Sequence, residues 1–312
     1  MPAMVLCAGL GTRLRPLSTW LAKPLAPVGD RPALAHILDR VRTFGGPTII
    51  NAHHHVDQLR AFLEGEARNV LISEEKELLD TGGGVRRGLE SIRASAGAGA
   101  SAGAGAGAGA GAPEPLLVWN GDILTTLDLP SLRAAHSLTP GPAGATLVVR
   151  PSPTPSGNIG LDASNRVVRM RRETVLPGEV RAADFLGIQV IGGGLYPRLP
   201  ERGGLVEAFY LPLLADGVLV RAWETDAPFH DIGTLATYLA ANLAWLAERG
   251  VASFVGEGAD VAAGVTLAGC VLGKGAVAEG EGALSRCVVW PGARAVAPLD
   301  GAVVTPFGVV RV

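Results

Sequence analysis

The sequence predicts an α/β protein in which a doubly wound, mostly parallel sheet is followed by a smaller, repetitive β domain. Short apolar runs typical of buried strands alternate with segments of helical periodicity, which is the order of elements in a parallel sheet. The last part of the chain instead repeats every 17 residues, which indicates stacked coils. We therefore expect two domains, residues 1–250 and 251–312.

Composition restricts the possible partners. The 312 residues carry a formal net charge of −2, which gives no electrostatic footprint for nucleic acid or an acidic membrane. No apolar run reaches the roughly 18 residues of a membrane span, and the N-terminus leads into a strand instead of a signal peptide. The three cysteines are too few for a disulfide scaffold. We expect a cytoplasmic protein that meets a small anionic substrate with locally gathered charge.

The first strand, Ala3–Ala8, leads directly into the loop GLGTR. Its glycines let the backbone come close to a phosphate chain and leave N–H groups that can point at anionic oxygens. Arg13, Arg15 and Lys23 add three cationic side chains. Lysine is rare in this chain, so Lys23 indicates a position that favours a compact ammonium group, which can bridge two phosphates.

A strand followed by GxG also fits a turn that merely starts a helix. The dinucleotide-binding fingerprint is excluded because Leu14 occupies the position of its third glycine, and no GK[ST] follows as in a P-loop. The longer stretch, GLGTRLRPLS followed by KPLAPVGDRP, resembles the signature of the nucleoside-diphosphate-sugar pyrophosphorylases, which are sugar-1-phosphate nucleotidyltransferases.

The remaining elements alternate as a doubly wound sheet requires, so ligands should collect at the carboxyl ends of the strands. A further helix, which carries Val85, Leu89 and Ile92, follows the third strand. The other expected elements are helices over Ala33–Phe44, Val56–Leu63 and around Leu235, Leu239 and Leu243, with strands over Thr48–Asn51, Val70–Ile72, Leu116–Trp119, Ala145–Arg150 and Phe185–Ile191.

A second glycine-rich segment, LLDTGGG, follows the third strand. It is either an ordinary helix start or a close backbone approach to a flat base. It resembles the base-binding segment of the same family, which implies that Thr81, Gly82 and Gly83 contact the nucleotide. Further on, Ala94–Ala112 is an alanine–glycine tract that we expect to be a flexible insertion without chemistry.

Two aspartates lie in motifs at separate places in the chain. Asp122 ends the motif NGD, and Asp231 lies in HDIGT before a helix. Each could serve only as a turn or helix cap, or as a ligand of a hard divalent cation. Both motifs resemble the places from which the pyrophosphorylases draw their metal aspartates, which implies a shared Mg²⁺.

The segment between these motifs is the expected sugar-binding half. SGNIGLD followed by RVVRMRRE resembles the family's hairpin beside the sugar, which implies contacts from Asn158 and Gly160. Many members carry a Glu-Lys-Pro whose lysine contacts the sugar phosphate, and this chain lacks it. Arg169, Arg171 or Arg172 is expected to substitute, because guanidinium binds phosphate well; Arg172 is the first choice.

The tail repeat needs no family to be recognised. Aligning Val255, Leu272 and Val289 also aligns three glycines and the pair Cys270 and Cys287. Two six-residue steps and one of five resemble the left-handed parallel β-helix of hexapeptide-repeat proteins. The two cysteines should stack as free thiols, and the tail should serve as a structural lid and a contact in a homo-oligomer.

The resemblance implies that a sugar 1-phosphate attacks the α-phosphorus of a nucleoside triphosphate (NTP), with Arg13 on the leaving pyrophosphate and Lys23 between the α-phosphate and the attacking phosphate. GTP with mannose 1-phosphate is the first choice. The alternatives are a uridylyltransferase for N-acetylmuramate 1-phosphate and a non-catalytic nucleotide-sugar-binding regulatory subunit. The implied nucleotide contacts are Ala8, Gly9, Gly11, Thr12, Thr81, Gly82, Gly83 and Asn120.

Overall fold

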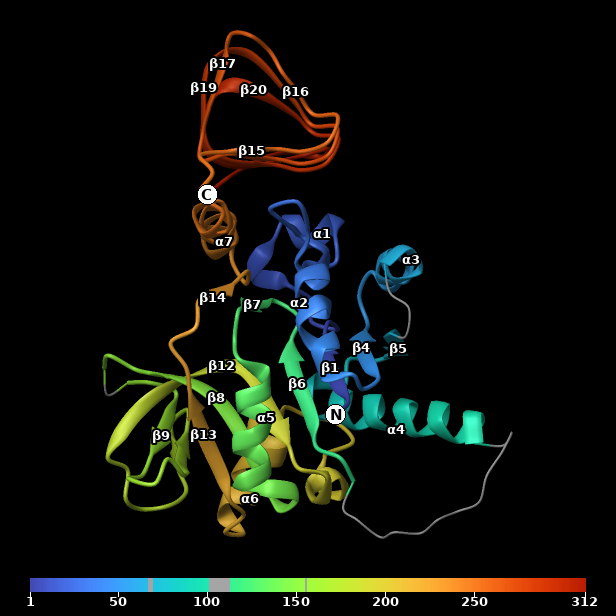
Figure 1. Ribbon diagram of the computed structural model, residues 1–312, viewed down its shortest axis with the longest axis vertical. Helices are drawn as coiled ribbons and strands as arrows, with labels where there is room; N and C mark the ends of the chain where they lie inside the picture. The colour runs from blue at the N-terminus through green and yellow to red at the C-terminus, as the bar shows by residue number, and fades with distance from the viewer. Residues whose placement is uncertain (67–69, 101–112, 155) are drawn as a thin grey trace. The chain divides into compact units, whose positions relative to one another are not determined.

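The computed structural model describes residues 1–66, 70–100, 113–154 and 156–312. They fall into two compact units, each built from two separate stretches of the chain (Figure 1). Unit 1 comprises Met1–Gly9 and Asp39–Phe229, and unit 2 comprises Leu10–Leu38 and His230–Val312. None of the helices in the described ranges is long and apolar enough to cross a membrane.

The main sheet of unit 1 is parallel on one side and antiparallel on the other. Strand β1 (Ala3–Leu6) pairs in parallel with β4 (Thr48–Ala52) and β6 (Leu116–Asn120), and β5 (Val70–Glu74) pairs in parallel with β4. Strand β12 (Arg181–Ile191) runs antiparallel to β6. The predicted α/β fold with a parallel-rich sheet is confirmed.

The antiparallel side contains the predicted hairpin. Strands β9 (Ile159–Leu161) and β10 (Val167–Met170) pair antiparallel, and β9 also pairs with β12. Strand β8 (Ala145–Pro151) pairs antiparallel with β12 and in parallel with β13 (Val220–Glu224). The other elements of unit 1 are β7 (Ile123–Thr125), β11 (Glu173–Thr174), and the helices α3 (Val56–Glu66), α4 (Asp80–Ala100), α5 (Leu129–Leu138) and α6 (Leu211–Ala215).

Helix α4 packs on β1, β4 and β5, as Figure 1 shows. Its side of the core contains Met4, Ile49, Val85 and Leu89, all nearly or fully buried. The first residues of the predicted flexible tract, up to Ala100, continue this helix, and residues 101–112 lie outside the described part of the chain.

Several element boundaries differ from the prediction, and three of the differences are the following. Strand β1 ends at Leu6, two residues early, because the next two N–H groups donate to a side chain instead of a strand. The first helix, α2 (Ala33–Val41), gives way to a 3-10 turn over Arg42–Phe44. Strand β12 begins at Arg181 instead of Phe185, because its polar start pairs with β9.

In unit 2, helix α7 (Leu235–Glu248) joins the two stretches of the chain. Tyr238 donates from its hydroxyl to the carbonyl of Pro27 at 2.6 Å, and Asn242 accepts the N–H of Gly29 at 2.9 Å. Trp290, from the tail, donates to the Tyr238 hydroxyl at 3.1 Å. The first stretch of unit 2 also contains α1 (Leu17–Trp20), β2 (Pro27–Val28) and β3 (Arg31–Pro32). Strand β14 (Phe229–Asp231) spans the boundary at which the second stretch begins.

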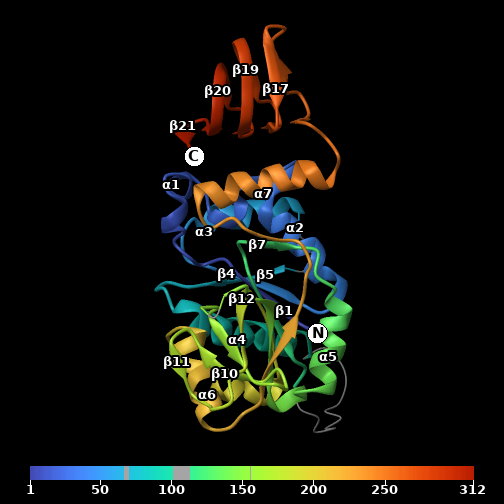
Figure 2. The same cartoon turned by 90° about the vertical axis from the view of Figure 1, so that its left-hand side faces the viewer.

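The tail stacks in parallel with the predicted period. Phe254 pairs with Val271, and Val271 pairs with Val288, both 17 residues apart. The cysteines are buried free thiols. Figure 2 shows three of the strands side by side. The strands are β15 (Phe254–Val255), β16 (Asp260–Val261), β17 (Val265–Ala268), β18 (Val271–Leu272), β19 (Val277–Val289), β20 (Arg294–Thr305) and β21 (Gly308–Arg311).

A glycine packed against helix α7 allows a test of this packing. Gly29 has φ +64°, and a Cβ there would lie 2.0 Å from the ring of Trp245. Gly29→Ala is therefore expected to destabilise the protein by about 2–5 kcal/mol, combining a left-handed backbone penalty with overpacking. Gly45→Ala is the matched control, because Gly45 has φ +70° and open space around its Cβ position. Urea unfolding midpoints for both variants should differ; equal shifts would contradict the packing argument.

Candidate functional site

In unit 1, the start of the predicted phosphate loop is held by a side chain from the neighbouring strand. Asn51, at the end of β4, accepts the N–H of Cys7 at 2.7 Å and that of Ala8 at 3.3 Å. A nucleotide contact by Ala8 would therefore have to use other atoms. A Cβ on the next residue, Gly9, would meet nothing within 4 Å, so the backbone there is open.

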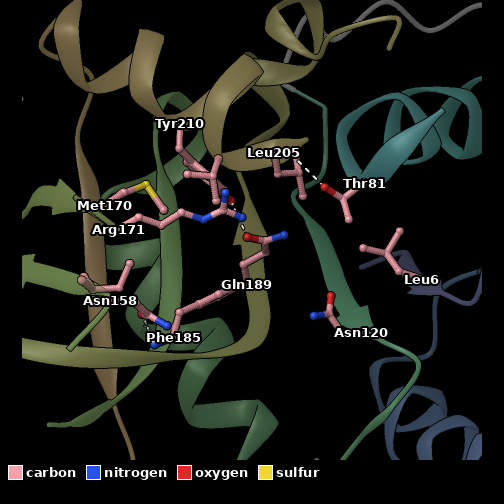
Figure 3. A pocket seen from close by; sticks show the side chains of 12 residues that line it. Leu6, Thr81, Asn120, Asn158, Met170, Arg171, Phe185, Gln189, Leu205 and Tyr210 are labelled. Atoms are coloured by element: carbon pink, nitrogen blue, oxygen red, sulfur yellow. Dashed lines mark hydrogen bonds between the residues drawn. The ribbon is translucent and has the colours of Figure 1, made fainter. Parts of the chain in front are cut away.

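A pocket of about 240 Å³ lies within unit 1 (Figure 3). Three of the predicted contact residues line it, namely Thr81, Asn120 and Asn158. Apolar side chains that include Met170 and Leu205 form much of the remaining wall. Apolar walls with a few placed polar groups are typical of a small-molecule site.

The polar groups of this pocket are oriented by hydrogen bonds. Tyr210 donates from its hydroxyl to Oε1 of the buried Gln189 at 2.8 Å, and burial raises the pKa of Tyr210, which keeps that donor protonated. The amide nitrogen of Gln189 is thereby directed away from Tyr210, as Figure 3 shows. Asn158 accepts the N–H of Phe185 at 2.8 Å through its side chain. Sequence reasoning missed Gln189 and Tyr210.

The three candidate arginines differ in position. Arg169 forms a bidentate pair with Glu179, and its side chain is only 13% exposed. Arg171 lines the pocket, has φ +54°, and pairs with Glu207. Arg172 is exposed and does not line this pocket. The geometry thus favours Arg171, one of the three arginines that the sequence left open, over Arg172.

Gly160 lies beneath the Arg169–Glu179 pair. A Cβ there would lie 2.4 Å from Oε2 of Glu179. The glycine thus makes room for that ion pair, and it is not among the residues that line the pocket.

The glycines of the TGGG segment pack against the protein itself. They lie in the first turns of α4, where the N–H groups of Gly82 and Gly83 both donate to the carbonyl of Gly203, at 2.9 and 3.3 Å. A Cβ on Gly83 would lie 2.6 Å from the carbonyl oxygen of Glu201. The close backbone approach predicted for a base is therefore made by a neighbouring loop, and nucleotide contacts from these two glycines stay a prediction.

Asp122 follows β6 and lies close to the start of the phosphate loop. The thiol of Cys7 packs against Gly121, where a Cβ would lie 2.9 Å from Sγ. Burial raises the pKa of Cys7 strongly, and the negative charge of Asp122 raises it further. Cys7 is therefore a neutral thiol, and the carboxylate of Asp122 supplies negative charge at this edge of the sheet.

Unit 2 brings Arg13 and Asp231 together around one glycine. A Cβ on Gly233 would lie 3.2 Å from Nη2 of Arg13 and 2.6 Å from Oδ1 of Asp231. Asp231 also accepts the N–H of Gly233 at 2.5 Å. The HDIGT motif thus holds its carboxylate beside the guanidinium of the phosphate loop.

The phosphate loop packs at Gly11 against Ser18 and Lys23. Gly11 has φ +61°, and its carbonyl accepts the hydroxyl of Ser18 at 2.7 Å. A Cβ on Gly11 would lie 3.3 Å from the Cβ of Lys23. Glycine is required at this position because of both its backbone angle and its close neighbours. Thr12 is exposed and begins the 3-10 turn that follows.

The donor set suits a hard divalent cation at the level of chemistry. Asp122 and Asp231 offer carboxylate oxygens, which are the ligands that Mg²⁺ prefers. Both side chains are only half-buried. Within the described residues, no group of three or more His, Cys, Asp and Glu side chains is arranged to hold a metal ion.

The parallel-rich sheet with a glycine loop after its central strand is an architecture of nucleotide-binding α/β enzymes. The family model described as nucleotidyl transferase matches residues 2–171, more than half of the chain. The chain belongs to the nucleotidyl transferase family, and it is an enzyme of the nucleotidyltransferase class.

Individual proteins resemble different parts of the chain. A mannose-1-phosphate guanylyltransferase of Mycobacterium tuberculosis is 29% identical over 312 residues, which cover 94% of this chain and 80% of that protein. An N-acetylmuramate α-1-phosphate uridylyltransferase of Caulobacter vibrioides is 39% identical over 94 residues, which cover 28% of this chain and 39% of that protein. The crystal structure of HddC from Yersinia pseudotuberculosis complexed with GMP-PN has a TM-score of 0.58 at 18% identity, covering 78% of this chain and 99% of that one.

Proposed function

We propose that this enzyme is a sugar-1-phosphate nucleotidyltransferase that converts an NTP and a sugar 1-phosphate into an NDP-sugar and pyrophosphate, with GTP and mannose 1-phosphate as the preferred pair. One observation carries the choice of substrates. The similarity to the guanylyltransferase of Mycobacterium tuberculosis extends over 94% of this chain and 80% of that protein, so it includes both the sheet and the tail.

In the proposed reaction, an oxygen of the sugar 1-phosphate attacks the α-phosphorus and pyrophosphate leaves. The attacking phosphate is already ionised, so no enzyme nucleophile is needed. The protein must align two polyanions that repel each other and must neutralise the charge that develops on the leaving group. Cationic side chains and backbone N–H groups are therefore the expected catalytic parts.

The loop supplies those parts in the proposal. Gly9, Gly11 and Thr12 contact the phosphates through the backbone, and open space at Gly9 supports this role. Arg13 neutralises the leaving pyrophosphate. Lys23 holds the α-phosphate and the attacking phosphate together.

We propose Asp122 and Asp231 as the residues that hold Mg²⁺. When bound, the ion would act as a Lewis acid on the α-phosphate and reduce the repulsion between the substrates. The position of Asp231 beside Arg13 supports a role for HDIGT at the phosphates.

We also propose that the tail is a short left-handed parallel β-helix of hexapeptide type that contributes to subunit contacts. The parallel pairing of residues 17 apart supports this assignment. A period of two six-residue steps and one of five gives one turn around three sides.

The pocket of unit 1 is the proposed site for the sugar phosphate, with Asn158 as a polar contact, and Thr81 and Asn120, the predicted nucleotide contacts, line the same pocket. Arg171 takes the place of the family's lysine in this proposal, because it is the arginine that lines the pocket. Both side chains of this ion pair are exposed, Arg171 by 64% and Glu207 by 55%. Because an exposed ion pair contributes little free energy, an incoming phosphate can replace the carboxylate of Glu207 at low cost.

Arg171→Ala is expected to raise the KM for the sugar 1-phosphate by about 10- to 100-fold, because a hydrogen bond to a charged group contributes about 1.5–3 kcal/mol. The KM for the NTP should change little. Arg172→Ala is the matched control, since its exposed side chain lies outside the pocket. The measurement is steady-state kinetics with each substrate varied in turn. A raised KM for the sugar 1-phosphate in Arg172→Ala, with an unchanged KM in Arg171→Ala, would assign the phosphate contact to Arg172 instead.

A pyrophosphate-release assay tests the function directly. The purified chain is supplied with Mg²⁺ and a panel of triphosphates and sugar 1-phosphates. Turnover with GTP and mannose 1-phosphate is the expected result. Preference for UTP with N-acetylmuramate 1-phosphate would instead favour the uridylyltransferase alternative. No turnover with any pair would contradict the proposal.

A further inference from the structure

A buried carboxylate lies directly after β5, beside the TGGG segment. Glu75 is 2% exposed. Its Oε1 accepts the side-chain amide of Asn51 at 2.8 Å, and its Oε2 accepts the N–H of Leu79 at 3.0 Å. Both oxygens of the side chain therefore act as acceptors.

This carboxylate determines which way the amide of Asn51 faces. Asn51 is itself 3% exposed. Since its nitrogen donates to Glu75, its oxygen must face the other way, where it accepts the N–H groups of Cys7 and Ala8. The first two N–H groups after β1 are thus fixed by a residue on β4, whose orientation is fixed in turn from β5.

The third glycine of TGGG makes room for this pair. A Cβ on Gly84 would lie 2.7 Å from the amide nitrogen of Asn51 and 2.8 Å from Oε1 of Glu75. Neither contact could be relieved easily, because both polar groups are buried and hydrogen-bonded. The glycine therefore lets helix α4 approach the pair.

We propose that Glu75 is a positioning residue for the phosphate loop. Through Asn51, it fixes the direction in which the chain leaves β1 and hence the conformation of the residues that follow. The inference rests on the proposed function insofar as that loop binds the NTP. Neither residue touches the nucleotide in this proposal. Their effect reaches it through the backbone at Cys7 and Ala8.

Glu75→Gln is the first test, because the side chain keeps its shape and loses one acceptor. One end of the new amide must face a donor, either Leu79 N–H or the amide of Asn51. A buried donor that is left without an acceptor is unfavourable. We expect the KM for GTP to rise about tenfold with a smaller change in kcat, and the amides of Cys7 and Ala8 to exchange with deuterium faster. Glu74→Gln is the matched control, because Glu74 is exposed and pairs only with Arg60 among the contacts described.

The double variant Asn51→Asp with Glu75→Gln should rescue the network. The carboxylate introduced on β4 would accept from Cys7 and Ala8 with one oxygen and from the introduced amide with the other, while the oxygen of that amide would accept from Leu79. Every hydrogen bond is restored with the charge moved by one side chain. Slow exchange at Cys7 and Ala8 should return, and the KM for GTP should fall most of the way to the original value.

The outcomes separate the positioning role from the proposed function. Exchange in the double variant as fast as in Glu75→Gln would overturn the positioning role, as would an unchanged KM in a folded Glu75→Gln. If the unaltered chain neither binds nor turns over GTP, the proposed function fails, and the exchange measurements still report whether Glu75 controls the loop.

Discussion

Lys23→Ala is expected to lower kcat by about 10²- to 10³-fold while the chain stays folded. In the proposed reaction its ammonium group lies between two phosphates whose repulsion is greatest in the transition state, so its loss is felt mainly there. Steady-state kinetics at saturating GTP and mannose 1-phosphate measure the effect. An unchanged rate in a folded variant would exclude Lys23 from catalysis.

The scarcity of lysine provides a clean control for that experiment. The other lysines are Lys76 and Lys274. Lys274 is exposed and pairs with Glu257 on the tail at 2.8 Å, so Lys274→Ala removes the same group at a place without proposed chemistry. Its kcat should equal that of the unaltered enzyme.

Asp231→Asn is expected to lower turnover by about 10²-fold or more at ordinary Mg²⁺ concentrations. An asparagine oxygen can still accept the N–H of Gly233, which the aspartate accepts now, so the turn is kept and the ligand charge is lost. A metal contributes several kcal/mol of charge stabilisation in such reactions. The measurement is turnover as a function of Mg²⁺ concentration, which should show a weaker apparent affinity for the ion.

The control for Asp231 is Asp226→Asn, an exposed aspartate close by in the sequence. It should leave the Mg²⁺ dependence unchanged. If Asp231→Asn gives the same dependence as this control, Asp231 caps its turn and holds no metal.

The parallel part of the fold was predictable because its signals are local. An apolar run and the glycine loop after it identify β1, and the helical spacing of apolar residues identifies α2 and α7. The early end of β1 was not predictable, since it depends on Asn51, which is 44 residues away from Cys7. The same holds for β12, whose polar start is a strand only because β9 lies beside it.

The candidate site shows the same division. Thr81, Asn120 and Asn158 were named from motifs, and all three line the pocket. Gln189 was missed, although the sequence contained a signal for it. A single polar residue in the apolar run GIQVI is expected to be buried and therefore to need a hydrogen-bond partner. That partner, Tyr210, comes from the π-helix Val206–Tyr210, whose place beside β12 no local pattern indicates.

For the TGGG segment, the sequence predicted that the glycines permit a close approach, but it did not identify the groups that approach them. Close approach was predicted for its glycines, and close approach is observed. The approaching groups are Gly203, Glu201 and the pair of Asn51 and Glu75. Packing alone thus accounts for glycine at these positions, whatever the nucleotide does there.

Unit 2 is built from one early and one late stretch of the chain. Because a ribosome makes the chain from its N-terminus, the early stretch is synthesised long before the residues that it packs against. The N–H of Gly29 can donate to Asn242 only after that residue, 213 positions further along, has been made, and the ring of Trp20 stacks at 5.1 Å on Phe307, which lies in the tail. The stretch with Arg13 and Lys23 therefore completes its packing only after α7 and the tail have been made, so a nascent chain that stalls before them carries these two cations without that support.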